Sequence, residues 1–223
     1  MTPSDLVPAR DAATVVIVRN APHDLEVLLM KRTSRASFVA GAHVFPGGAV
    51  DAEDAAHPLP VGSGRPLHPD GHQFLVAAVR ECFEEAGLLY AHYRDGAPTS
   101  DDQRTRWRAE LARGDRMFHQ LIADEGLVLD VGPLRYLSRW VTPVGSPKRF
   151  DARFFLAPEL PGQVATPDRN EITESGWFSP SEALRRADRG EMLLILPTRM
   201  TLQALATASS IGELFSRHLA PLR

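Results

Sequence analysis

The chain has 223 residues, 43% of them hydrophobic, and a formal net charge of −3 at pH 7. That length suffices for one well-packed domain with a helical appendage, and the slightly negative charge gives no basis for broad nucleic-acid binding. Cys82 is the single cysteine, which excludes an intrachain disulfide and favours a reducing compartment.

The chain begins with two predicted strands. Residues 12–19 and 25–31 are apolar and rich in β-branched side chains, and the proline-containing segment 20–24 predicts a turn between them. The second strand ends in Lys31 and Arg32, which either bind phosphate or form a solvated strand end.

A proline and two adjacent glycines follow in the segment Phe45-Pro46-Gly47-Gly48. Adjacent glycines let the backbone turn sharply and approach a ligand or a neighbouring helix closely. Residues 55–72 are then rich in proline, glycine and histidine, a composition that predicts an irregular surface excursion.

Residues 73–86 have the period of an amphipathic helix that ends at Gly87, a residue suited to the left-handed conformation after a helix. Three acids, Glu81, Glu84 and Glu85, fall on the face nearly opposite the apolar residues. The apolar face is formed by Leu75, Val79, Cys82, Phe83 and Ala86.

The position of these acids is unfavourable for the helix alone. They lie near its C-terminus, where the helix dipole disfavours negative charge, and Glu81 and Glu85 repel each other at the four-residue spacing. Arg80, four residues before Glu84, can pair with it. Two interpretations stay open at this point: a solvated acidic face, or carboxylates gathered to hold a divalent cation.

A helical insert is predicted at about residues 97–130. Ser100 and Gln103 form a capping box that begins a helix toward residue 113, and a second helix extends to about residue 125.

The remaining chain shows no linker that separates domains. We predict one domain over residues 1–223, with extra C-terminal helices at about 180–219. Strands are predicted at 134–142, 150–156 and 174–178, and helices at 180–188 and within 198–219.

Gly48 and residues 80–88 resemble the Nudix box of the Nudix hydrolases. That box runs from a glycine through five residues to a glutamate, then through seven residues to Arg-Glu-apolar-any-Glu-Glu-any-Gly-apolar. Residues 80–88, Arg-Glu-Cys-Phe-Glu-Glu-Ala-Gly-Leu, match its second half at every specified position. Two features depart from it. The spacer is much longer, and the first glutamate is replaced by Asp54 or, counting back from Arg80, by His72.

The segments around the box are similar to those of coenzyme A diphosphatases. Residues 28–32 and 44–48 resemble the approach to the box, except that Ser37 stands where the pattern carries an additional arginine. Residues 140–143 and 149–155 resemble the branch with a long insertion inside the box, which includes the peroxisomal acyl-coenzyme A diphosphatases.

The resemblance implies an α/β (α+β) fold, namely a Nudix-type α/β/α sandwich with a mixed β-sheet. It also implies metal-dependent hydrolysis of a diphosphate linkage in a nucleoside diphosphate derivative, with Mg²⁺ or Mn²⁺ as the cofactor. Coenzyme A or acyl-coenzyme A is the first substrate expected, followed by NADH and ADP-ribose.

The resemblance also implies roles for particular residues. Arg80 is expected to orient a glutamate, and the general base is a box glutamate or one of Glu171 and Glu174, of which we assign Glu174. For Phe45, a place in the core is the alternative to contact with a nucleobase. The expected metal ligands are Glu81, Glu84 and Glu85, the catalytic residues are Arg80, Glu84, Glu85 and Glu174, and the substrate-binding residues are Arg32, Phe45, Gly47 and Gly48.

Two other classes of function remain as alternatives: a related metabolite-binding or regulatory module without turnover, and an interaction protein whose acids only solubilise a helix. We expect a cytoplasmic protein with a small nucleotide-type substrate, without nucleic-acid or membrane partners, and a homodimer is compatible with the resemblance. The first eleven residues lack the features of a signal peptide, and the final three differ from a peroxisomal Ser-Lys-Leu.

Overall fold

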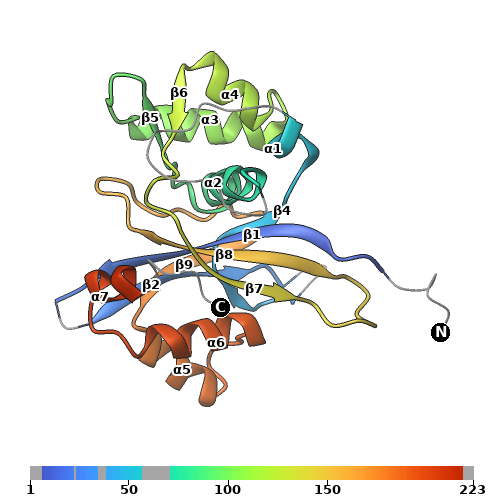
Figure 1. The fold of residues 1–223 in the computed structure, drawn as a ribbon, viewed down its shortest axis with the longest axis vertical. Helices are drawn as coiled ribbons and strands as arrows, with labels where there is room; N and C mark the ends of the chain where they lie inside the picture. The colour runs from blue at the N-terminus through green and yellow to red at the C-terminus, as the bar shows by residue number, and fades with distance from the viewer. Residues whose placement is uncertain (1–6, 23, 35–38, 57–70, 218–223) are drawn as a thin grey trace.

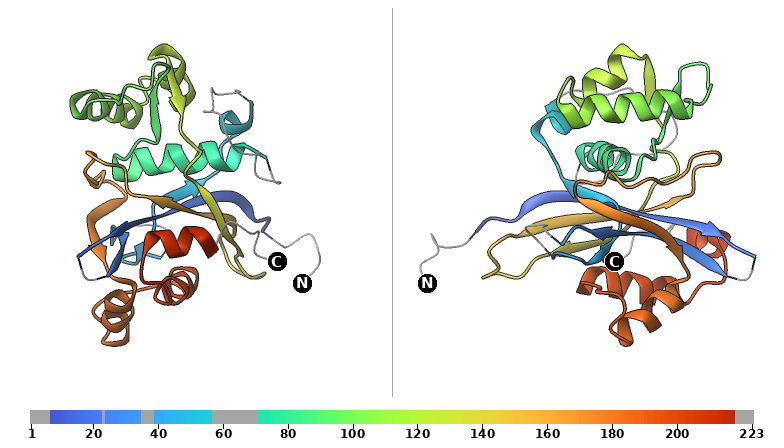
Figure 2. Two further views of the ribbon diagram at one scale, coloured as in Figure 1. Left: turned by 60° about the vertical axis from the view of Figure 1, so that its left-hand side comes forward. Right: turned by 180° about the vertical axis from the view of Figure 1, so that it is seen from behind.

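The computed structural model describes residues 7–22, 24–34, 39–56 and 71–217. Its centre is a mixed seven-stranded sheet with helices packed on both faces (Figure 1). The turned views in Figure 2 show the same three layers. The arrangement confirms the predicted α/β/α sandwich.

The main sheet joins segments from both ends of the chain. Its strands are β1 (Arg10–Asn20), β2 (Leu25–Arg32), β3 (His43–Val44), β4 (Gly47–Ala49), β7 (Arg135–Val141), β8 (Phe150–Pro158) and β9 (Ile172–Phe178). The order is β3-β2-β1-β8-β7, with β4 paired to β1 and β9 paired to β2. β1 and β8 run parallel, and the other neighbours are antiparallel.

β1 contributes to a hydrophobic core on each face of the sheet. Ala13, Val15 and Ile17 point into one core, and Val16 and Val18 point into the other. Successive side chains of a strand point to opposite faces, so a strand covered on both sides is apolar throughout. This is the reason for the continuous apolar run that predicted the strand.

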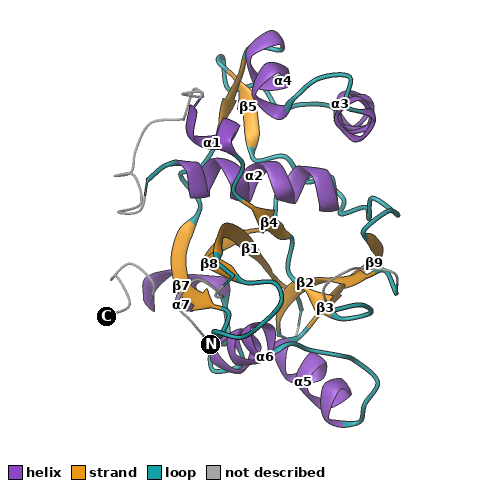
Figure 3. Ribbon diagram, turned by 90° about the vertical axis from the view of Figure 1, so that its right-hand side faces the viewer, coloured by secondary structure: helices purple, strands orange, loops and turns teal. Residues whose placement is uncertain are grey.

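The helices form one layer on each side of the sheet. On one side lie α1 (Ala52–Ala56), α2 (Gln73–Ala86), α3 (Asp101–Arg113) and α4 (Phe118–Asp124), and on the other α5 (Pro180–Asp188), α6 (Leu196–Leu205) and α7 (Ile211–Arg217). In Figure 3, α2 runs between the sheet and the insert that carries α3 and α4. A two-stranded antiparallel sheet of β5 (Ala91–Tyr93) and β6 (Leu127–Leu129), which the sequence did not predict, joins the two ends of this insert.

The central position of α2 bears on the interpretation of its acidic face as a solvated surface. Leu75, Cys82 and Phe83 pack in the core as predicted, but Arg80 and Glu85 are also buried, with 7% and 6% of their surface exposed. Arg80 meets α1 and β4, and Glu85 meets β4, rather than bulk water.

The predicted ends of the helices agree with the structure. Gly87 ends α2 with a left-handed φ of 72°, and its N–H donates to the carbonyl of Phe83. Ser100 and Gln103 form the predicted capping box of α3. Of the irregular segment predicted at 55–72, residues 57–70 lie outside the described residues. Within the described ranges, no helix has the length and apolar character needed to cross a bilayer.

Candidate active site

A cavity of about 680 Å³ opens at the C-terminal half of α2. Glu81, Glu84 and Glu85 line one wall. The facing walls come from α3 and from residues 164–171, the segment that leads into β9. The volume lies within the usual range for small-molecule sites.

Arg80 is the centre of a charge network beside this cavity. Its Nε and Nη2 donate to the two carboxylate oxygens of Asp54 at 3.0 and 2.9 Å, and Nη2 also donates to the carbonyl of Ala49 at 2.8 Å. Nη1 donates to Glu81 at 2.7 Å and to Glu84 at 3.4 Å, which confirms the predicted pair of Arg80 with Glu84. Burial would lower the pKa of Arg80, but Asp54 and the neighbouring glutamates outweigh it and raise the pKa above its ordinary value.

Of Asp54 and His72, the two candidates for the first acid of the sequence pattern, Asp54 is the one that contacts Arg80. Asp54 is 3% exposed, and it accepts a further hydrogen bond from the backbone N–H of Asp51. His72 directly precedes the first residue of α2, at the opposite end of the helix from Glu84 and Glu85. If Asp54 is the first acid, the inserted residues lie between Asp54 and α2 in the sequence, and Asp54 still contacts Arg80 in the folded chain.

The two adjacent glycines support the glutamates directly. The N–H of Gly47 donates to Glu85 at 2.9 Å. A Cβ at Gly48 would lie 2.5 Å from the carboxyl carbon of Glu81, and a Cβ at Gly47 would lie 2.4 Å from the carbonyl oxygen of Ala13. Only glycine fits at position 47, because its backbone passes against the backbone of β1, and a side chain at position 48 would displace the carboxylate of Glu81.

The positive charge around the three glutamates does not offset the cost of burying their carboxylates. Burial raises the pKa of Glu85 to about 8 and that of Glu81 to about 7, and it also raises the pKa of Glu84. Arg80 opposes the shift at Glu81, and the Gly47 N–H opposes it at Glu85. A cation bound beside these buried carboxylates would favour their charged form and lower their pKa values.

The donor set fits a hard divalent cation in its chemistry, because such ions take carboxylate oxygens from several side chains. In the described part of the chain, no three acidic or metal-binding side chains are already close enough together to form a metal site. Glu81 is instead directed at Arg80.

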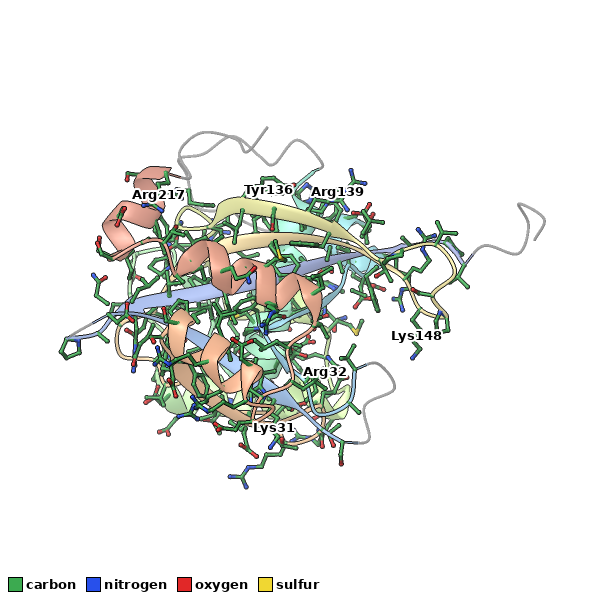
Figure 4. The ribbon with its side chains drawn as sticks, turned by 90° about the horizontal axis from the view of Figure 1, so that it is seen from below. Lys31, Arg32, Tyr136, Arg139, Lys148 and Arg217 are labelled. Carbon is green, nitrogen blue, oxygen red and sulfur yellow. The ribbon has the colours of Figure 1, made fainter. Side chains whose placement is uncertain are left out.

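The remaining predicted residues divide between the site and its surroundings. Phe45 is 3% exposed and packs edge-on against Phe154, so the structure supports the core alternative for it. Arg32 lies 3.4 Å from Glu171, which lines the cavity. Glu174 is 67% exposed, pairs with Lys31 at 3.1 Å, and is not among the described residues that line the cavity. In Figure 4, Lys31 and Arg32 lie on the β2 side of the sheet, away from Tyr136 and Arg139 on β7.

Two residues of the site were missed from the sequence. The carboxylate of Asp168 accepts hydrogen bonds from the backbone N–H groups of Asn170, Glu171 and Ile172, which shapes the loop before β9. Arg108 of α3 lines the cavity opposite the glutamates. The helical period places Arg108 on one face with Arg104, but nothing in the sequence indicates that this face covers α2.

A family model described as the NUDT19 Nudix domain matches residues 61–205. The acyl-coenzyme A diphosphatase NUDT19 of Gallus gallus is 31% identical over 264 residues, covering 92% of this chain and 70% of that protein. The Homo sapiens protein of the same name is 30% identical over 233 residues, covering 84% of this chain. The chain spans only 62% of the length of that human relative.

Solved structures agree with these relatives. A crystal structure of a Nudix hydrolase from Alicyclobacillus acidocaldarius is 32% identical with a TM-score of 0.79, covering 94% of this chain and 96% of that chain. A MutT Nudix hydrolase from Burkholderia pseudomallei, 18% identical with a TM-score of 0.50, covers 88% of this chain and 98% of that chain, and shares the fold. The chain therefore belongs to the Nudix hydrolase family, and within it to the group described by the NUDT19 Nudix domain.

Proposed function

We propose that the protein is a diphosphatase that uses a divalent cation to hydrolyse the diphosphate linkage of coenzyme A or acyl-coenzyme A. One observation carries this proposal: three glutamates at the end of one helix line the same cavity, and burial raises the pKa of each. The names of the relatives supply the substrate class, since a fold alone does not identify a substrate.

In the proposed reaction, the oxygen of water forms a bond to one phosphorus, and the bond from that phosphorus to the bridging oxygen breaks. The products are two phosphomonoesters, and the protons of water pass to a base and to the products. Glu81, Glu84 and Glu85 would hold Mg²⁺ or Mn²⁺, which neutralises the diphosphate and acidifies water when bound. Arg80 holds Glu81 and Glu84 in place, and the Gly47 N–H holds Glu85.

We propose Glu171, rather than the initially assigned Glu174, as the general base outside α2. Glu171 lines the cavity, and its backbone N–H is held by Asp168. Its partner Arg32 has a side chain that is 19% exposed and lies beside this wall of the cavity, a position that suits contact with a substrate phosphate. Glu171→Gln is expected to reduce turnover more than Glu174→Gln, measured as kcat for both variants.

The alternative of a binding module without turnover is not favoured by the residues present. Arg80, Glu81, Glu84 and Glu85 all retain the side chains that the catalytic pattern specifies. Arg80 is bonded to Asp54, and Glu85 accepts a hydrogen bond from the N–H of Gly47.

A substrate panel tests the proposed function. Coenzyme A, acyl-coenzyme A, NADH and ADP-ribose are each incubated with Mg²⁺ or Mn²⁺ in heavy-oxygen water, and the products are identified by mass spectrometry. Two phosphomonoesters, one carrying the heavy oxygen, are expected from coenzyme A or its acyl esters. Binding of these compounds without turnover would instead support the regulatory module.

The double variant Glu84→Gln, Glu85→Gln assigns the reaction to this site. Loss of two carboxylates that would hold the cation is expected to lower kcat by more than about 10²-fold. Glu213→Gln on α7, which removes one partner of an exposed ion pair with Arg217, is the control and should leave kcat unchanged. Wild-type kcat in the double variant would show that another part of the protein carries the reaction.

A further inference from the structure

The C-terminal end of α2 carries no basic residue in its last turn. Glu84 and Glu85 lie there, together with the negative end of the helix dipole. The last carbonyls of a helix also have no partner within the helix itself. This end of α2 therefore needs hydrogen-bond donors and positive charge from elsewhere in the chain.

Arg108 of α3 supplies both. Its Nε donates to the carbonyl of Glu84 at 2.8 Å, and its Nη2 donates to the carbonyl of Glu85 at 2.5 Å. The backbone of two consecutive glutamates is thus held by one guanidinium, whose planar fork directs its donors to fixed positions.

The same guanidinium also binds the loop before β9. Nη1 donates to the carbonyl of Thr166 at 2.7 Å and to its hydroxyl at 3.1 Å. The N–H of Thr166 in turn donates to the carbonyl of Ala86 at 2.8 Å. Close packing accompanies these contacts, since a Cβ at Gly87 would lie 2.8 Å from the Thr166 hydroxyl and 3.2 Å from Nη1 of Arg108.

This loop carries the acids on the opposite wall of the cavity. Asp168 follows Thr166 by two residues, and its carboxylate orders the backbone up to Glu171. Arg108 therefore joins the helix that carries Glu84 and Glu85 to the segment that carries Glu171. No other described side chain donates to both α2 and this loop.

We propose that Arg108 is a positioning residue of the diphosphatase site, which sets the distance between the glutamates of α2 and Glu171 through its bonds to three backbone carbonyls. The inference rests on the proposed function. It assigns to the helical insert a part in catalysis, because Arg108 belongs to α3 of the insert. Arg108 lines the cavity, but its hydrogen bonds go to backbone carbonyls and the Thr166 hydroxyl, so its proposed role is to hold the groups around it.

Arg116 provides a matched control within the same insert. It is a partly buried arginine that pairs with Glu110 at 2.7 Å, Glu125 at 2.9 Å and Asp124 at 3.6 Å. All three partners belong to the insert, and none lines the cavity. Replacement of Arg116 therefore weakens the insert without disconnecting α2 from the loop before β9.

The test compares Arg108→Met, Arg108→Lys and Arg116→Met in the full chain. Arg108→Met is expected to lower kcat about 10- to 100-fold, as loss of a residue that supports catalytic groups commonly does, with KM changed less than about threefold. Arg108→Lys keeps the charge but cannot reach all three carbonyls, so partial recovery of kcat is expected. Arg116→Met should keep kcat within about twofold at temperatures below its unfolding transition.

Hydrogen exchange of the metal-free protein gives a readout that does not depend on turnover. Amides of residues 164–171 should exchange at least about tenfold faster in Arg108→Met and at the wild-type rate in Arg116→Met. Wild-type kcat and exchange in Arg108→Met, or equal losses of kcat in Arg116→Met, would overturn the inference. If Arg108→Met does not fold, wild-type kcat in Arg108→Lys would overturn it, because the three-way contact would then be unnecessary.

The two proposals fail in different ways. If the wild-type protein hydrolyses nothing in the substrate panel, the proposed function is wrong, while the exchange data still report whether Arg108 orders the loop. If the wild type is active and Arg108→Met is equally active, only the role of Arg108 is wrong.

Discussion

The two helical layers of this protein handle charge in opposite ways. On one side of the sheet, α5, α6 and α7 cover an apolar core and form their ion pairs at the surface, as in Arg185 with Glu182 and Arg217 with Glu213. We call this side the exposed layer. On the side of α1 to α4, the described part of the chain buries charged side chains at or against α2 and the insert. These buried residues are Asp54, Arg80, Glu85, Arg104 and Arg153, the last stacked over the ring of Phe74.

The difference separates two uses of ionisable groups. An exposed pair is hydrated with or without its partner, so it contributes little to stability. A buried charge depends on its partner, because the cost of removing it from water is offset only by close contacts. The layer of α1 to α4 therefore carries the cost of removing charges from water, which the layer of α5 to α7 avoids. The candidate active site lies in the layer of α1 to α4.

Arg80 gives the largest expected effect. In Arg80→Met, Asp54 stays buried without its cation, and we expect a loss of about 3–5 kcal/mol in the free energy of unfolding, measured by urea denaturation. Arg217→Met in the exposed layer should leave the urea midpoint nearly unchanged. Adding Asp54→Leu to Arg80→Met should recover part of the loss, and a further loss would show that Asp54 is stabilised by other contacts.

The length of each element, rather than its layer, decides what the sequence could predict. β1, β2, α2 and α3 were found because their periodicity or capping residues extend over eight residues or more. β3, β4, β5, β6 and α1 were missed because they have between two and five residues, too few to show a period. The helices on the other side of the sheet were predicted at 180–188 and within 198–219, and they have between seven and ten residues.

The candidate site was only partly predictable. Glu81, Glu84 and Glu85 follow a pattern along one helix, so the chain itself brings them together. The partners Asp54, Arg108 and Glu171 come from three distant segments, and only tertiary structure decides which of them meets α2. For the same reason, the sequence left both Asp54 and His72, and both Glu171 and Glu174, as candidates, and the contacts of Asp54 with Arg80 and the place of Glu171 at the cavity support the proposals made here.

The pH dependence of stability is expected to separate the layers as well. Burial raises the folded-state pKa of Glu85 from its ordinary value of 4.5 to about 8. The folded state then holds a proton that the unfolded chain releases, so the metal-free protein loses stability as the pH rises from about 4.5 to about 8. Glu85→Gln removes this ionisation, and in metal-free buffer its stability relative to wild type should increase over that interval.

Added Mg²⁺ or Mn²⁺ should oppose this loss in the wild type, since a ligand that binds only the folded state stabilises it. The measurement is the melting temperature of both proteins from pH 5 to pH 9, with chelator and with metal. An equal pH dependence in wild type and Glu85→Gln would contradict the raised pKa. Equal stabilisation of both proteins by metal would place the cation away from Glu85.

Glu182 gives the smallest expected effect and is the counterpart of Glu85 in the exposed layer. Hydrogen bonds from Arg186 and Arg185 lower its pKa, opposite in sign to the shift at Glu85. Its carboxylate is hydrated even when these arginines move away, so Glu182→Gln should leave the melting temperature nearly unchanged at neutral pH. High salt should reduce any difference further, because it screens exposed pairs. A clear, salt-resistant loss in Glu182→Gln would mean that this layer also depends on fixed charges, and that burial alone does not distinguish the side of the sheet that carries the candidate active site.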